Sequence, residues 1–467
     1  MLRNAKRFIY VTVVHNFSER YDSHRKMIRI SKILFLTFIT TICYSQEIRH
    51  WKKYSNPIEA GFSTDKLSQA KQFFDSTNAV SLMLIKNGNV VVAWGDVQRR
   101  YKCHSVRKSL LNSLYGVGVK LNFIDIEKTI GELGIKEKVE LLESEKSAKV
   151  RDLLSMSSGI YLNSALQPDV GGSPPRGSFK AGQNQYYNNW DFNVLGTIYN
   201  QESKSEVFSD FKKYIADPIS MEDFRVFDGT YEYEEISLHP GYPLKLSTRD
   251  LARFGQLYLQ EGNWNGIQII DTSWINKSMI PFQVVENMGN AATGYGYLWW
   301  IQERKGEAER YFALGWGEQY LGVFPNEAIV IVIRADSYFG EYFVEKSRES
   351  LIKLLLDSQV LEPMSNPDLD TLKIVDNISE KITLPEKKLL SYVGTYTIEN
   401  NDIPNINSDF EIYLQDGELI LKGLHYAYKF RLIPLSKDKF YIEDIDLYLR
   451  FEKSNIDNKL KPKIIKE

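Results

Sequence analysis

Two strand-rich segments lie far apart in this sequence and bracket a mostly helical stretch. The first, residues 81–94, places Asn87-Gly88 between two runs of β-forming residues, which is typical of a tight hairpin. The second comprises similar runs near residues 295–301, 310–314, 319–324 and 328–334. A strand buries its apolar face against another layer, so we expect both segments to join one antiparallel sheet flanked by helices. The predicted fold class is therefore α/β (α+β), with a helical insert between the two sets of strands.

Apolar residues at helical spacing mark much of the remaining region. They recur in residues 64–76, 105–119, 247–262 and 341–356. Residues 247–262 also begin with Ser-x-x-Asp and end in glycine, as helices commonly do. We expect these helices to cover the sheet.

The chain is long enough for more than one domain. Residues 361–388 contain three prolines and many charges, which is typical of a linker. Residues 389–467 contain repeated β-forming runs and an Asp416-Gly417 turn signal, which predict a small β domain. We assign residues 46–360 to the main domain, and we expect the β domain to stabilise it or to shape its cleft.

The N-terminal residues have the pattern of a signal for export. Within residues 27–45, a short basic stretch precedes the apolar residues 33–42, and the small residues Cys43 and Ser45 follow. This predicts a cleaved signal peptide, preceded by an upstream extension, residues 1–26, and a periplasmic or extracellular protein. An uncleaved anchor is the alternative. Cleavage would leave a single cysteine, so we expect no internal disulfide.

Several classes of function are excluded by what the sequence lacks. The net charge of −2 offers no basic field for nucleic acid. Six histidines, of which four follow the predicted cleavage site, are too few for a multi-histidine metal site. The sequence has no Gly-x-Ser-x-Gly, no phosphate-binding loop and no His-Glu-x-x-His. We therefore expect a small-molecule substrate, with no metal, cofactor or nucleic acid, and the sequence does not indicate an oligomeric state.

A serine activated without histidine remains, and Ser105-Val-Arg-Lys108 fits it. On a helix the two side chains would be about 60° apart and one turn along. Burial could leave the lysine neutral enough to accept the serine proton. The tetrapeptide recurs elsewhere, but only Ser105 directly follows the hairpin and opens a long apolar helix. His104 is not placed to deprotonate its chain neighbour, and Cys103 could serve as a thiol nucleophile or as a buried apolar residue.

The segments around this serine resemble the serine β-lactamase and penicillin-binding protein superfamily. Within it they are most similar to class C β-lactamase-like esterases and to 6-aminohexanoate (nylon) oligomer hydrolases. Residues 103–116 resemble the nucleophile helix of these proteins. Residues 150–159, 185–196, 247–255, 294–300 and 313–320 follow in the order found in the family. The resemblance spans about residues 60–355.

The resemblance implies roles for particular residues. Ser105 would be the nucleophile, and Lys108 and Tyr187 would share the proton that it gives up. Asn189 would hydrogen-bond Lys108 or the substrate amide. The tyrosine–asparagine pair could also lie one residue earlier, at Tyr186 and Asn188.

A third family element is the strand Gly315-Trp316-Gly317-Glu318. The backbone N–H of Glu318 or Gln319 would complete an oxyanion hole with that of Ser105. No cation lies where the family's β-lactamases hold a substrate carboxylate, which favours esters or amides without one. Glu318 could repel anions or bind an amine, or it could be a solvated glutamate.

These residues together predict a serine hydrolase that forms an acyl-enzyme on an ester or amide substrate. A β-lactamase or a D-Ala-D-Ala carboxypeptidase is the alternative within the same chemistry. A non-catalytic sensor or binding protein is the alternative of another class. Specificity would come from the loops near residues 160–185 and 220–245.

Overall fold

A computed structural model of the chain describes most of the sequence after the predicted leader. The described residues are 50–167, 172–283, 291–304, 307–339, 343–373, 378, 381–398, 403, 405–453 and 460–466. Both the predicted extension and the signal peptide lie outside them. Contacts divide the chain into residues 1–47 and a compact unit, residues 48–467, to which everything below refers. Within the described residues no helix has the length and apolar character needed to span a bilayer.

The centre of the fold is a nine-stranded sheet in the order β13-β1-β3-β2-β12-β11-β10-β9-β8. Its strands are β1 (Lys52–Tyr54), β2 (Ala79–Lys86), β3 (Asn89–Gly95), β8 (Gly294–Tyr295), β9 (Trp300–Arg304), β10 (Glu307–Gly315), β11 (Gln319–Phe324), β12 (Ile329–Ala335) and β13 (Leu369–Thr371). Strand β2 pairs antiparallel with β12, with Met83 opposite Val332. The predicted sheet built from both strand-rich segments is thus confirmed, although β1 and β3 pair in parallel at one edge.

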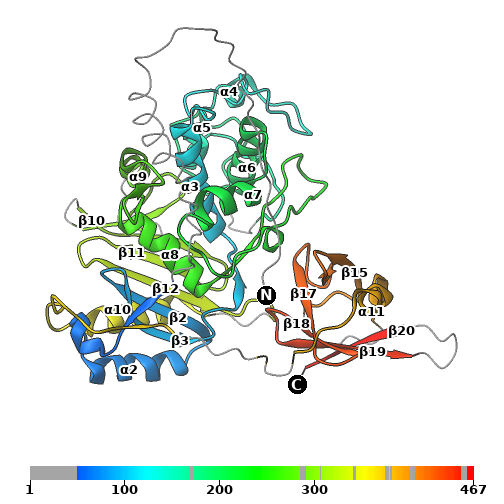
Figure 1. The fold of residues 1–467 in the computed structure, drawn as a ribbon. Coiled ribbons are helices and arrows are strands. Elements are labelled where there is room, and N and C mark those ends of the chain that lie inside the picture. The colour runs from blue at the N-terminus through cyan, green and yellow to red at the C-terminus, as the bar shows by residue number, and fades with distance from the viewer. Residues whose placement is uncertain are drawn as a thin grey trace, which may run out of the picture. The chain divides into compact units, whose positions relative to one another are not determined.

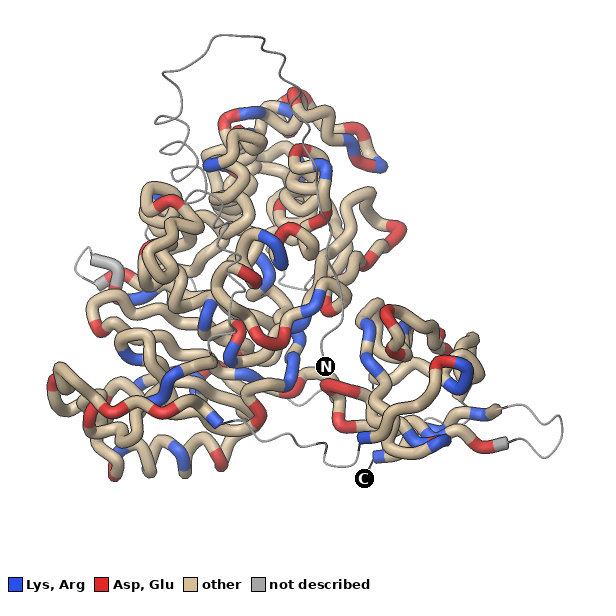
Figure 2. Tube along the Cα trace, viewed as in Figure 1, with Lys and Arg blue, Asp and Glu red and all other residues tan. Residues whose placement is uncertain are grey.

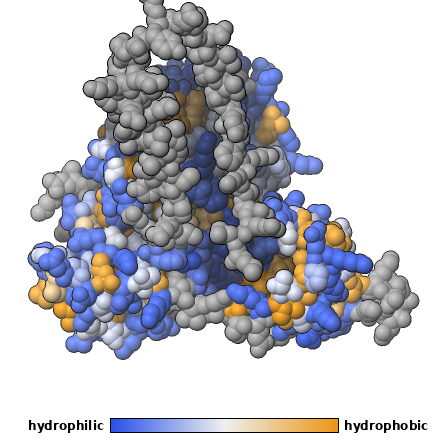
Figure 3. All heavy atoms as spheres, viewed as in Figure 1, coloured by the Kyte–Doolittle hydropathy of each residue, from blue (hydrophilic) through white to orange (hydrophobic). Residues whose placement is uncertain are grey.

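Alternate side chains of β2 enter two separate cores, as strand geometry requires. Leu82 and Leu84 pack in the core formed with α2 (Thr64–Asp75) and α10 (Glu345–Asp357). Met83 and Ile85 pack in the larger core on the opposite face. Figure 1 shows the sheet with α2 and α10 on one face and the helices of the insert on the other. In Figure 3 the described side chains visible on the surface are mainly hydrophilic, with hydrophobic ones in small groups.

The larger core joins the sheet to the helical insert. Its helices are α3 (Val106–Lys120), α4 (Glu143–Lys146), α5 (Val150–Leu154), α6 (Asn189–Ser203), α7 (Val207–Phe211), α8 (Thr248–Leu259) and α9 (Thr272–Ser278). Short pairs of strands accompany them: β4 (Arg100–Lys102) with β5 (Lys245–Ser247), and β6 (Asn263–Trp264) with β7 (Ile267–Gln268). Helix α3 is buried from Val106 to Gly118, because it lies between the sheet and the other helices of the insert. Its apolar stripe, seen in the sequence, is therefore only part of its buried surface.

The C-terminal strands form a second, seven-stranded antiparallel sheet. They are β14 (Gly394–Thr397), β15 (Asp409–Gln415), β16 (Glu418–Lys422), β17 (Lys429–Pro434), β18 (Lys439–Ile442), β19 (Leu447–Lys453) and β20 (Leu460–Ile465), preceded by α11 (Glu386–Leu389). The first and last strands come into contact, so the sheet nearly closes into a barrel around its own core. We call these strands the C-terminal β domain. Asp416 and Gly417 form the turn predicted between β15 and β16, and both have positive φ. Strand β13, from the segment predicted as a linker, pairs with β1 of the main sheet.

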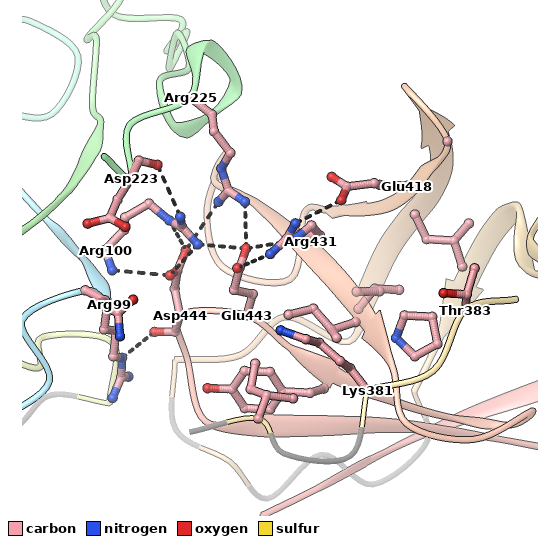
Figure 4. Close-up of a pocket in the computed structure, with 18 of the residues that line it drawn as sticks. Arg99, Arg100, Asp223, Arg225, Lys381, Thr383, Glu418, Arg431, Glu443 and Asp444 are labelled. Atoms are coloured by element: carbon pink, nitrogen blue, oxygen red, sulfur yellow. Dashed lines mark hydrogen bonds and ion pairs between the residues drawn. The ribbon is translucent and has the colours of Figure 1, made fainter. Parts of the chain in front are cut away.

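Buried ion pairs connect the C-terminal β domain to β4 and β5 (Figure 4). Arg100 of β4 contacts Glu443 at 2.7 Å and Asp444 at 3.0 Å. Lys245 of β5 contacts Asp444 at 2.9 Å, and Arg225 contacts Glu443 at 2.6 Å. Arg100, Arg225, Glu443 and Asp444 line a cavity of about 880 Å³. Figure 2 shows that positive and negative residues are interspersed along the chain. The interface is therefore held by paired charges.

We expect Asp444→Asn to lower the free energy of unfolding by about 3–5 kcal/mol at pH 7, because Arg100 and Lys245 would stay buried with one fewer partner. Burial opposes ionisation of Asp444, but attraction to Arg100, Lys245 and Arg225 outweighs it and holds the pKa of this carboxyl well below its usual range. A carboxyl with a depressed pKa stabilises the fold fully above its unfolded pKa of about 3.9, and this stabilisation is lost as the pH falls below that value. Urea denaturation at several pH values should show the difference between wild type and variant narrowing in acid. Asp446→Asn, at an exposed partner of Arg99, should change stability by no more than about 1 kcal/mol.

Candidate active site

The candidate nucleophile lies in a tight turn between β4 and α3. Ser105 is the residue that precedes α3, and His104 before it has a φ of 48°. This left-handed conformation is unfavourable for a residue with a Cβ, and it is found mainly where surrounding contacts hold it. His104 Nε2 lies 2.7 Å from Ser337 Oγ. Burial, followed by the nearby Lys102, lowers the pKa of His104 well below its usual range, so His104 is a neutral residue whose ring lies at hydrogen-bond distance from Ser337.

Three side chains that the sequence separates come together at the start of α3. Lys108 Nζ donates a hydrogen bond to Ser105 Oγ at 2.8 Å, across one helical turn. The same Nζ lies 2.5 Å from the hydroxyl oxygen of Tyr187, which precedes α6. Lys108 therefore lies between the serine hydroxyl and the phenol, within proton-transfer distance of both.

The surroundings of Lys108 disfavour its charged form. Its side chain is 1% exposed, and its Nζ lies 4.4 Å from the ring centres of both Tyr187 and Phe192. Burial, and then the charge of Arg107, lowers the pKa of Lys108 well below its usual range. A neutral amine is a proton acceptor, so this environment makes Lys108 a candidate base.

Aromatic packing fixes the position of Tyr187. Its ring stacks on Trp300 of β9, with 5.7 Å between centroids and 13° between planes. It also contacts Tyr295 edge-on and Phe192. Burial raises the pKa of Tyr187, against a hydrogen bond from Ser105 that lowers it, which favours a phenol over a phenolate. When the phenol and the amine are both neutral, the amine can accept one more proton. The pair can therefore take up the proton of Ser105.

The two candidate asparagines have structural partners. Asn189 Nδ2 donates to the backbone carbonyl of Leu166, so the described structure does not show the expected hydrogen bond to Lys108. The start of α6 directs this side chain to a neighbouring loop instead. Its Oδ1 is buried without a hydrogen-bond partner in the described residues, and recognition of a substrate amide stays a prediction. Asn188 caps α6 through Trp190 N and donates to Ile160 at 2.7 Å.

The end of β10 packs directly against the nucleophile turn. A Cβ at Gly315 would lie 2.4 Å from the carbonyl oxygen of Cys103 and 3.1 Å from His104 Cβ. Trp316, 63% exposed, follows in the turn to β11, in which Gly317 and Glu318 have positive φ. The absence of a side chain at position 315 thus permits the end of β10 to lie close to Cys103 and His104, which directly precede Ser105.

Glu318 has a different role from any that the sequence suggested. Its carboxylate forms an ion pair with Arg348 of α10, whose side chain is fully buried. A buried guanidinium needs a partner, and this contact supplies one. Glu318 is therefore a partly buried member of an ion pair and not a freely solvated carboxylate. The side chain of Gln319 is also engaged, with Ala335 and Arg334.

We expect Gly315→Ala to lower kcat/KM by roughly 10–100-fold, because the added methyl must displace β10 or the Cys103–Ser105 turn and a misplacement of about 1 Å can have that effect. The measurement is the rate of ester hydrolysis alongside the thermal unfolding midpoint. A variant with wild-type kcat/KM would show that the close approach at position 315 has no part in catalysis. A variant that loses activity only in proportion to its unfolded fraction would show the same.

Cys103 and His239, two other side chains with possible chemistry, are structural. Cys103 is completely buried, and burial raises the pKa of its thiol, which disfavours the thiolate that a nucleophile would need. Both ring nitrogens of His239 lie within hydrogen-bond distance of partners, Thr197 and the carbonyl of Lys136. In the described part of the chain, no group of three or more His, Cys, Asp or Glu residues could hold a metal ion. No local pattern in the sequence points to Trp300 or Phe192, although both lie in segments that carry the resemblance.

Comparisons with known proteins identify the family and the fold. A family model described as Beta-lactamase matches residues 71–348. A solved structure from Bacteroides dorei DSM 17855, assigned as a beta-lactamase, has 15% identity and a TM-score of 0.50, over 64% of this chain and 99% of that one. An octameric penicillin-binding protein homologue from Pyrococcus abyssi has 20% identity and a TM-score of 0.48, over 86% and 98% of the two chains. At these identities the likeness concerns the fold alone. No curated protein sequence matches the chain.

Proposed function

Because this chain belongs to the beta-lactamase family of hydrolases, we propose that it is a serine hydrolase that forms an acyl-enzyme at Ser105. The observation that carries this proposal is the position of Lys108, buried between the Ser105 hydroxyl and the Tyr187 phenol. Such a cluster can accept a proton from an alcohol without an imidazole.

The proposed reaction has two steps. Ser105 Oγ attacks the substrate carbonyl while its proton passes to the Lys108–Tyr187 pair, and the same proton then passes to the leaving alcohol or amine. The backbone N–H of Ser105 and that of Glu318 or Gln319 would face the oxyanion. Among the described residues the N–H of Ser105 donates to no backbone carbonyl, which leaves it available. Water then attacks the acyl-enzyme, with the pair acting as the base.

We propose esters or amides without an anchoring carboxylate as the substrate class. The segment 315–318 beside the nucleophile contains no lysine or arginine, and its one charged side chain is paired with Arg348. An anionic group on the substrate would therefore find no counter-charge at this strand end. This disfavours β-lactams and D-Ala-D-Ala peptides, which carry a carboxylate next to the scissile amide.

The test is a substrate panel combined with covalent labelling of the wild-type protein. The panel contains p-nitrophenyl acetate, a 6-aminohexanoate dimer, nitrocefin and a D-Ala-D-Ala peptide, and a fluorophosphonate serves as the label. We expect turnover of the ester and a mass increase on the peptide that contains Ser105. Labelling without turnover of any compound would support a sensor or binding protein instead. A folded protein that is not labelled would contradict the proposal.

A further inference from the structure

The strand that leads into the nucleophile turn is held by the C-terminal β domain. Residues 100 and 102 of β4 share one face, since side chains alternate along a strand. Arg100 binds Glu443 and Asp444 (Figure 4). Lys102 Nζ lies 3.2 Å from Nε2 of His425, which is 323 residues further along the chain in the connection from β16 to β17. The C-terminal β domain therefore contacts both side chains on this face of β4.

Lys102 is also connected, through Ser337, to His104, the residue that precedes Ser105. Its Nζ donates to the carbonyl oxygen of Ser337 at 2.8 Å. The hydroxyl of the same serine lies 2.7 Å from His104 Nε2. His425 Nε2 in turn lies 3.1 Å from the carbonyl oxygen of Tyr338. A largely buried set of polar contacts thus runs from His425 through Lys102 and Ser337 to His104, the residue before Ser105, whose backbone is left-handed.

We infer that the C-terminal β domain is a positioning part of the active site, in which His425 holds Lys102 and through it the His104–Ser105 turn. This inference rests on the proposed function and adds a residue from outside the matched family segment. His425 acts through its neighbours, since no contact joins it to Ser105, Lys108 or Tyr187 in the described structure. Its effect should therefore appear in the reactivity of Ser105 and not in the affinity for substrate.

The hydrogen bonding of His425 suggests a variant that should restore its role. One ring nitrogen cannot donate to Tyr338 and accept from Lys102 at the same time, and the other, Nδ1, is buried without a partner in the described residues. A glutamine amide carries both an acceptor and a donor at the end of a similar reach. Phenylalanine fills a comparable volume with neither.

The experiment compares the rate of inactivation by a fluorophosphonate for wild type, His425→Phe and His425→Gln. We expect His425→Phe to lower this rate and kcat for an ester by roughly 10–100-fold, with KM within about threefold of wild type. His425→Gln should recover most of the lost rate. Asp446→Asn, which removes the exposed charge of the same domain that pairs with Arg99, should react as wild type does.

The outcomes separate this inference from the proposed function. A wild-type protein that does not react contradicts the proposed function. A reactive wild type with His425→Phe within twofold of it overturns the inference, and so does a His425→Gln variant that is no better than His425→Phe at equal thermal stability. Should His425→Phe fail to fold, Lys102→Met removes the same contact from the other side. It should show the same loss in the labelling rate, and a wild-type rate would overturn the inference equally.

Discussion

Ser105→Ala is expected to abolish labelling by fluorophosphonates and to lower ester hydrolysis by roughly 10⁴-fold or more, because the variant has no atom that can form the acyl bond. Its fold should persist, since Ser105 is only partly buried and its side chain does not cap α3. Labelling followed by peptide mass spectrometry, with hydrolysis of p-nitrophenyl acetate, checks the expectation.

The buried thiol next to this turn provides the matched control. Cys103→Ala removes the other potential nucleophile two residues away, and it should leave both labelling and hydrolysis within a few-fold of wild type. Undiminished hydrolysis by Ser105→Ala, or a loss of labelling confined to Cys103→Ala, would show that Ser105 is not the nucleophile.

Lys108→Met should lower kcat/KM by roughly 10³-fold, since it removes the proton acceptor while filling a similar volume. The same variant is expected to unfold at a higher temperature than wild type. Burial lowers the pKa of Lys108 in the folded state, so at neutral pH the unfolded chain binds the lysine proton more tightly than the folded chain does. This difference in proton binding lowers the free energy of unfolding. Methionine has no charge to lose on burial, so the variant should gain stability while losing activity, as is common where function and stability compete. Ester hydrolysis and thermal unfolding at pH 7 together test the two opposite effects.

The pH dependence follows from the same shift. The proton-accepting form of the cluster exists above the folded-state pKa of Lys108, so kcat/KM should fall as the pH drops through that value. Because burial lowers the pKa of Lys108 well below the ordinary lysine value, activity should persist to a lower pH than an exposed lysine base would allow. Tyr187→Phe keeps the ring packing against Trp300 but loses the phenol, and should also lower kcat/KM by roughly 10³-fold. A Lys108→Met enzyme with an unchanged rate or an unchanged acid limb would contradict the assignment of the base.

Local patterns accounted for the elements of the fold. The Asn87-Gly88 and Asp416-Gly417 signals lie at hairpins, and the helix expected from residue 105 begins at Val106. Ser105 and Lys108 were recognisable as a pair because three residues make nearly one helical turn. Only the resemblance points to Tyr187, since no local rule relates it to a lysine 79 residues earlier. The partners of Asn189 and Glu318 were not foreseen, because each contacts an element remote in sequence.

The order of strands and helices, and the serine and lysine at the start of α3, are properties of the sequence itself, because they depend on side-chain periodicity over a few residues. Only the folded chain decides that Tyr187 and Trp300 enclose Lys108, that Glu318 binds Arg348, and that His425 reaches Lys102. These contacts depend on how layers pack, and packing is set by the shapes of surfaces that come together from distant parts of the chain. The physical reason is burial: a lysine that would be charged in water becomes a proton acceptor once the tertiary structure has removed the water around it.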